Sequence, residues 1–180
     1  WVTGLILLYV VYWHGSLSMG ESVGNLMFDA GTEVTGIAHL MILITFVAVF
    51  AYDYLYSSGL IKDVKIMTVA TFVLIAGIIY LMKFYGGFGY RAFNIHLGAL
   101  FGTNMAFNVW FRIWPAQQKI ITAIKNGEAP DPDLAALAGL RSKHNTYMSV
   151  PLVWTMMNEH TTLFAGGNFG ITDSTNWLVL

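Results

Sequence analysis

Long apolar segments dominate this sequence and constrain its fold more than any other feature. Five such segments are separated by turns and one polar stretch, and most approach the ~20 residues that a helix needs to cross a bilayer. Backbone groups surrounded by lipid must bond to one another, which favours helices. The segments lack the alternation of a transmembrane β-barrel. Predicted spans cover about 1–13, 35–56, 64–82, 90–114 and 145–165, the fourth closed by Pro115.

The composition favours an all-α integral membrane protein. Hydrophobic residues make up 56% of the 180 residues and charged residues only 11%, whereas soluble domains carry ~25% charged residues. We expect one transmembrane domain over 1–180, a bundle of about five to six helices in a lipid bilayer. The apolar start at Trp1 and the start of a further span at 177–180 indicate a chain cut at both ends. No basic stripe accompanies the net charge of −1, so nucleic acid is not an expected partner.

The absence of cysteine limits the redox chemistry that this chain can support. Disulfides, Fe–S clusters, thiolate zinc sites and covalently attached haem c are excluded on this chain. A redox centre would need other ligands, of which neutral imidazole is the commonest.

Basic residues are distributed unevenly between the predicted loops. Cytoplasmic loops of membrane proteins carry an excess of Lys and Arg. If 57–65 and 112–144 face the cytoplasm, seven of the nine basic residues lie inside, and only Lys83 and Arg91 lie outside. We therefore predict a bacterial cytoplasmic membrane protein whose loop 116–144 is cytoplasmic. The seven inner basic residues are Lys62, Lys65, Arg112, Lys119, Lys125, Arg141 and Lys143.

This topology brings four of the five histidines to one level below the outer surface. A rise of 1.5 Å per residue places His14, His39, His96 and His160 within ~10 Å of one another in depth. Ionisable residues within spans usually face a bundle interior or a functional cavity. His39, His96 and His160 are therefore candidate metal ligands, as axial ligands of haem b or as ligands of copper or non-haem iron. Interfacial contacts and interhelical hydrogen bonds are the structural alternatives.

Two charged residues extend this candidate site. Glu159 is a candidate catalytic residue, because it could orient a histidine ligand or carry a proton. A buried pair and exposure to an outer cavity are the alternatives for it. Arg91 lies at the outer edge, where it could bind the propionates of a haem cofactor.

The fourth span carries more polar residues than a lipid-facing helix needs. His96 and Thr103 share a face, and Asn104 and Asn108 form a neighbouring stripe. Gly98 and Gly102 give a surface of small residues for close helix approach. The asparagines, which include Asn94, could simply join helices through hydrogen bonds.

The segment from His96 to His160 resembles the membrane domain of bacterial membrane-bound urate hydroxylase, in the urate oxidase N-terminal family. "AYDYLY" (51–56) also resembles the end of an earlier family helix, so the resemblance extends over about residues 46–160. The residues that match family motifs are His96, Gly98, Ala99, Pro115, Gln117, Lys119, Gly127, Glu128, Pro130, Asp131, Pro132, Arg141, Ser142, His144, Asn145, Tyr147, Met156 and His160.

The resemblance implies an integral-membrane oxidoreductase that passes electrons toward a periplasmic cytochrome c. It adds His144 to the candidate catalytic residues and supports a role for His96 and His160. We therefore expect an electron-transfer subunit with a histidine-ligated redox centre in the outer half of the bundle. Two alternatives stay open. One is a cofactor-free accessory subunit, bound to other membrane subunits of a respiratory or photosynthetic complex. The other is urate hydroxylation itself.

Overall fold

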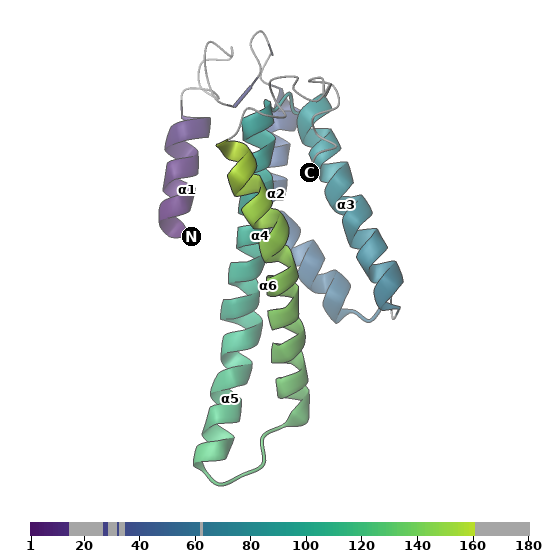
Figure 1. The fold of residues 1–180 in the computed structure, drawn as a ribbon, viewed down its shortest axis with the longest axis vertical. Helices are drawn as coiled ribbons and strands as arrows, with labels where there is room; N and C mark the ends of the chain where they lie inside the picture. Colours follow the sequence, from purple (N-terminus) through teal and green to yellow (C-terminus); the bar gives the residue numbers. More distant parts are fainter. Residues whose placement is uncertain (15–26, 29–31, 33–34, 62, 161–180) are drawn as a thin grey trace.

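The computed structural model describes residues 1–14, 27–28, 32, 35–61 and 63–160, which form a bundle of helices. The described part contains no β-strand, only an isolated bridge between Phe28 and Phe88. The all-α prediction is confirmed. In chain order (Figure 1) the elements are α1 (Val2–Leu8), the π-helix η1 (Tyr9–Trp13), α2 (Gly36–Ser57), α3 (Val64–Phe84), α4 (Tyr90–Phe107), the π-helix η2 (Asn108–Ile113), α5 (Trp114–Lys125) and α6 (Pro132–Glu159).

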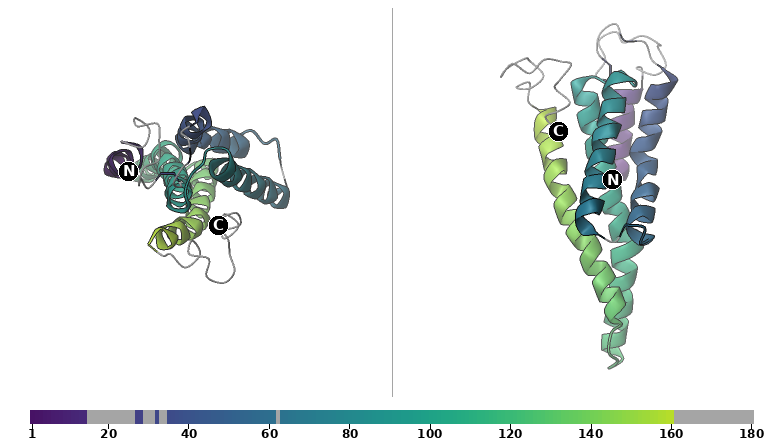
Figure 2. Two further views of the ribbon diagram at one scale, coloured as in Figure 1. Left: turned by 90° about the horizontal axis from the view of Figure 1, so that it is seen from above. Right: turned by 90° about the vertical axis from the view of Figure 1, so that its right-hand side faces the viewer.

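Helices α4 and α6 form the centre of the bundle and run antiparallel. We call the end where α4 begins and α6 ends the upper end, and the end where α2 ends and α3 begins the lower end. Helix α5 and the first half of α6 form a hairpin that extends past the lower ends of α2 and α3 (Figures 1 and 2). Helix α1 lies at the periphery of the bundle.

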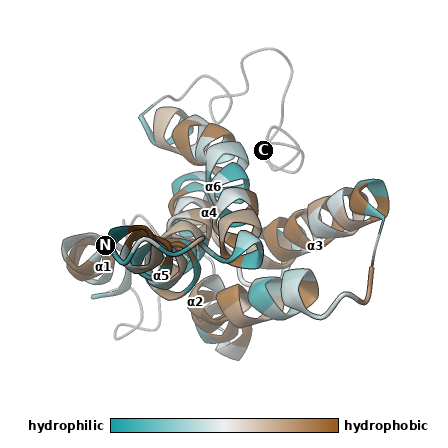
Figure 3. Ribbon diagram, turned by 90° about the horizontal axis from the view of Figure 1, so that it is seen from below, coloured by the Kyte–Doolittle hydropathy of each residue, from teal (hydrophilic) through white to brown (hydrophobic). Residues whose placement is uncertain are grey.

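Among the described residues, two helices are long and apolar enough to cross a membrane. They are α2, with 22 residues, and α3, with 21 residues. Most residues of their apolar windows are not buried inside the bundle. Large apolar side chains such as Phe50, Phe72 and Val73 are exposed on them, and hydrophobic residues extend along α3 in Figure 3. These two helices support a membrane location.

The helix that begins at Tyr90 does not end at Pro115. Helix α4, η2 and α5 form one uninterrupted helical run from Tyr90 to Lys125, so the prediction of a helix end at Pro115 was wrong. Inside a continuous helix a proline removes one i→i−4 hydrogen bond. Pro115 is the second residue of α5 and directly follows η2, where the hydrogen-bond pattern changes from α to π.

Gly98 lets α6 approach α4 closely. A Cβ atom at Gly98 would lie 2.9 Å from Thr155 Oγ1 and 3.6 Å from Leu152 Cδ1, whereas no atom of the described residues lies within 4 Å of the same position at Gly102. The predicted small-residue surface therefore serves close helix packing at Gly98 and not at Gly102.

This difference predicts opposite effects for two matched substitutions. Gly98→Ala should lower the free energy of unfolding by about 1–3 kcal/mol, because it overpacks the contact between α4 and α6. Gly102→Ala should raise it by about 0.5–1 kcal/mol, because alanine is the better helix former and meets no neighbour. Reversible unfolding in SDS micelles would measure both. Equal effects of the two substitutions would contradict the close approach at Gly98.

Candidate functional site

Polar side chains from α2, η2 and α6 meet at the lower end of the bundle. Helix α2 contributes its last turns, η2 its first residue Asn108 together with Arg112, and α6 three residues in its first half. Hydrogen bonds and ring contacts join the residues into one group, which we call the lower cluster. It consists of Tyr52, Asp53, Tyr56, Ser57, Asn108, Arg112, Arg141, His144 and Asn145.

Asp53 binds two arginines from different helices. Its carboxylate accepts hydrogen bonds from Nε of Arg112 at 3.0 Å and from Nη2 of the same residue. It also accepts one from Nη2 of Arg141 at 2.8 Å, and that nitrogen donates to Ser57 Oγ at 2.8 Å as well. Two guanidinium groups against one carboxylate leave an excess positive charge in the lower cluster.

Arg141 is the most deeply buried charged side chain of the lower cluster. Only 1% of its side chain is exposed, and its Nε and Nη1 atoms have no hydrogen-bond partner among the described residues. Its guanidinium carbon lies 5.2 Å from the centroid of the Tyr52 ring, which gives a cation–π contact. A buried charge that is only partly paired raises the local positive potential.

Tyr52 and Asn108 orient the imidazole of His144. Asn108 Nδ2 donates to the Tyr52 hydroxyl at 2.9 Å and to Asn145 Oδ1 at 2.8 Å. The Tyr52 hydroxyl lies 2.8 Å from His144 Nδ1. The Tyr52 oxygen can accept a second hydrogen bond, and in the tautomer whose Nδ1–H donates to it, His144 Nε2 keeps a free lone pair.

The surroundings keep the His144 imidazole neutral. Burial lowers the pKa of His144, and the positive charge of Arg141 lowers it further. Since an unperturbed histidine titrates near pH ~6.5, the lowered pKa leaves His144 uncharged at pH 7. A neutral, oriented imidazole is a suitable proton acceptor.

Aromatic rings form one side of the lower cluster. The ring centroids of Tyr52 and Tyr56 are 5.1 Å apart, and those of Tyr56 and His144 are 4.5 Å apart. All three side chains are half-buried. The three rings therefore pack against one another beside the Arg141 guanidinium.

At the upper end, His96 is completely buried and both of its ring nitrogens are occupied. Nδ1 lies 2.6 Å from the carbonyl oxygen of Ala92, and Nε2 accepts a hydrogen bond from Trp13 Nε1 at 2.9 Å. The ring of Phe88 lies 4.9 Å away, centroid to centroid. A metal bound at His96 Nε2 would have to displace Trp13.

The other residues predicted at the upper end lie apart or on the surface. His39 is exposed on α2, with Nδ1 3.2 Å from the carbonyl oxygen of Thr35. His160 caps the end of α6 and is exposed, as is Arg91. Glu159 is half-buried, and its Oε1 accepts a hydrogen bond from Tyr12. Within the described part of the chain, no three His, Asp or Glu side chains form a group that could hold a metal ion.

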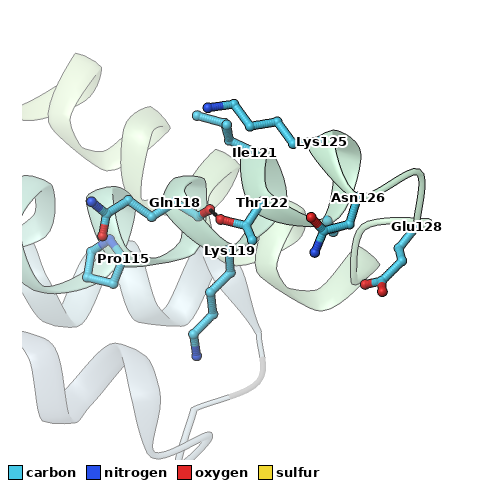
Figure 4. Close-up of a pocket in the computed structure, with 9 residues that line it drawn as sticks. Pro115, Gln118, Lys119, Ile121, Thr122, Lys125, Asn126 and Glu128 are labelled. Atoms are coloured by element: carbon cyan, nitrogen blue, oxygen red, sulfur yellow. Dashed lines mark hydrogen bonds between the residues drawn. The ribbon is translucent and has the colours of Figure 1, made fainter.

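Two hollows on the described part of the protein lie away from both groups. A shallow groove runs along α5, where Ile121 and Lys125 point to one side of the helix and Lys119 to the other (Figure 4). An apolar pocket of about 200 Å³ lies between α1 and α4, lined among others by Leu8, Phe46 and Thr103. The groove along α5 carries Lys119, Lys125 and Glu128, and the side chains that line the apolar pocket are not titratable.

Sequence reasoning found His144 but missed most of the lower cluster. Asp53, Arg112 and Arg141 come from three helices, and Asp53 and Arg141 are separated by 88 positions. One signal could have found them, because ionisable residues inside apolar segments are rare and often pair with one another. Asp53 and Arg112 are such a pair, at the ends of two predicted spans.

The comparisons with known proteins identify a family. The family model described as urate oxidase N-terminal matches residues 1–180. A search of curated proteins and a search of solved structures each found no match.

Proposed function

Because this chain belongs to the urate oxidase N-terminal family, we propose that it is the membrane-embedded module of a urate-oxidising enzyme with its substrate site at the lower cluster. Arg141 carries this proposal: it is a charged side chain, 1% exposed, beside an oriented and neutral His144. Urate is planar and negatively charged at neutral pH. Its charge is complementary to the excess positive charge of the lower cluster, and its rings can stack on the half-buried aromatic side.

The chemistry assigned to the lower cluster is hydroxylation with removal of two electrons. Urate and water give hydroxylated urate, two protons and two electrons. His144 accepts a proton in this reaction, and Tyr52 holds the imidazole in the required orientation. The excess positive charge from Arg112 and Arg141 stabilises the negative charge of the substrate as it loses that proton. The electrons pass to a cytochrome c that is a separate partner.

The membrane orientation follows from the charge distribution. Helices α2 and α3 cross a bacterial cytoplasmic membrane, and the hairpin of α5 and α6 lies in the cytoplasm with its basic residues. In this orientation urate reaches the lower cluster from the cytoplasm. The upper end faces the periplasm, where a cytochrome c or another membrane subunit accepts electrons.

A direct assay tests this function. Membranes that contain the full-length protein should consume urate, detected by loss of its ultraviolet absorption, and reduce two molecules of cytochrome c for each urate consumed. Membranes from cells without the protein are the control. A purified, folded protein with its native partner subunits that consumes no urate would refute the proposal.

The buried His96 favours a second candidate function, an electron-transfer subunit that holds haem b in the upper half. A fully buried imidazole among aromatic rings could serve as an axial ligand if Trp13 moved away from Nε2. Arg91, His39 and His160 remain the other predicted residues for such a cofactor.

This second candidate predicts a coloured protein. A purified sample should give a pyridine haemochrome spectrum, and His96→Ala should abolish or shift the Soret band, because the iron loses a ligand. His14→Ala is the control, since His14 is exposed. A colourless and metal-free sample would exclude the redox centre on this chain. If that sample also co-purified with a stoichiometric membrane partner and oxidised no urate, it would indicate an accessory subunit instead.

A further inference from the structure

Three charged side chains of the lower cluster form a row that runs from the interior of the bundle to its surface. Arg141 lies innermost with 1% of its side chain exposed, Asp53 follows with 13%, and Arg112 lies outermost with 36%. The Asp53 carboxylate lies between the two guanidinium groups and accepts hydrogen bonds from both. An anion that approaches from outside the bundle therefore meets Arg112 first.

Asp53 fixes the guanidinium of Arg112 in one orientation. Nε of Arg112 donates to Asp53 Oδ1 at 3.0 Å, and Nη2 donates to Asp53 Oδ2. Two parallel hydrogen bonds of this kind hold the plane of a guanidinium group in place. They leave Nη1 of Arg112 without a partner among the described residues, and this atom is not enclosed as Nη1 of Arg141 is. Arg112 Nη1 is therefore an oriented donor that a ligand can reach.

Arg141 prevents Asp53 from neutralising Arg112. A single pair of arginine and aspartate has no net charge, but here one carboxylate faces two guanidinium groups, which leaves one positive charge on the row. Because Arg141 is enclosed, a ligand can approach that excess charge only at the exposed end of the row. A monoanion bound there balances the charge of the row, whereas a neutral compound gains no such attraction.

We propose that Arg112 is the residue that binds the anionic edge of the substrate, and that it selects monoanions over neutral compounds of the same outline. Asp53 is the positioning residue for the Arg112 guanidinium. Arg141 does not touch the substrate, because its unpaired nitrogens are enclosed, and it acts through the charge that it places next to Asp53. The proposal rests on the proposed function for the identity of the substrate.

Equilibrium binding of two purines to the full-length protein in detergent tests this selection. Urate is a monoanion at neutral pH, and hypoxanthine is a neutral purine of similar outline. Arg112→Gln should weaken urate binding at least tenfold, a change within the range of one hydrogen bond to a charged group, and should leave hypoxanthine binding within twofold. Arg112→Lys should recover part of the affinity for urate, because lysine restores the charge without the fixed fork. Both variants should fold, since Asp53 stays paired with Arg141.

Lys119→Gln is the matched control for the loss of one positive charge. Lys119 is exposed on α5, seven positions beyond Arg112, and lies outside the lower cluster. Its replacement should change urate affinity by less than twofold. If Lys119→Gln and Arg112→Gln weakened urate binding equally, the attraction would come from the overall charge of the hairpin, and a specific contact at Arg112 would be excluded. Unchanged urate affinity in Arg112→Gln would overturn the proposal directly.

Binding and turnover can fail independently of each other. If the protein binds urate in a way that depends on Arg112 but does not consume it, the proposed function fails and the anion site stands. If the protein consumes urate and Arg112→Gln leaves KM unchanged, the proposed function stands and the role of Arg112 is excluded. A tenfold or larger rise in KM for Arg112→Gln, with little change for Lys119→Gln, would support both.

Discussion

Asp53→Asn should lower the free energy of unfolding by about 3–5 kcal/mol, the cost typical of removing one partner of a buried ion pair. Asparagine keeps the size of the side chain but removes the charge that both arginines share. Arg112 is 36% exposed and can reach water, whereas Arg141 is 1% exposed and cannot. The uncompensated charge of Arg141 therefore determines the loss.

Two variants separate the loss of charge pairing from a general effect of the substitution. Asp63→Asn is the control, because Asp63 is an exposed residue at the start of α3 with no arginine partner among the described residues. The double variant Asp53→Asn with Arg141→Met should recover much of the loss, since it removes the buried charge as well. SDS or thermal unfolding measures all three. If Asp53→Asn had the same free energy of unfolding as Asp63→Asn, the lower cluster would not depend on the Asp53 carboxylate.

The sequence predicted the helices well because their signal is local. Apolar segments of sufficient length define α2 and α3 to within a few residues. The continuation through Pro115 was missed because π-helical turns of the kind found in η2 have no signature in the sequence. The further span predicted at 177–180 and the end of the span predicted at 145–165 lie outside the described residues.

The sequence could not predict which side of each helix faces the interior. The rise per residue of a helix gives the depth of a histidine in the membrane. The direction in which the histidine side chain points depends on which face of the helix packs against its neighbours. On α2 the buried face is Ala38, Met41, Thr45 and Val49, so the neighbouring His39 is exposed. In a membrane helix both the lipid-facing side and the packed side are apolar, and hydrophobic periodicity cannot distinguish them. The lower cluster was missed for the same reason, since it depends on three helices turning their polar residues toward one another.

His144→Gln should lower kcat for urate oxidation by about 10²–10⁴-fold, the usual contribution of a positioned proton acceptor. Glutamine can still form a hydrogen bond with Tyr52, so the fold of the lower cluster should persist, but its amide cannot take up a proton. KM should change little, because the charge of the cluster resides on the arginines. His39→Gln is the control, since His39 is exposed on α2 far from the lower cluster.

The pH dependence distinguishes this role from a structural one. The reaction needs neutral His144, and burial together with Arg141 lowers its pKa below the usual value. The rate of the unmodified protein should therefore be maintained as the pH falls through ~6.5, and should decrease only at more acidic pH, where His144 becomes protonated. The residual rate of His144→Gln should lack this decrease. If both proteins lost activity over the same acidic range, another group would be responsible, and His144 would be a structural partner of Tyr52 rather than the proton acceptor.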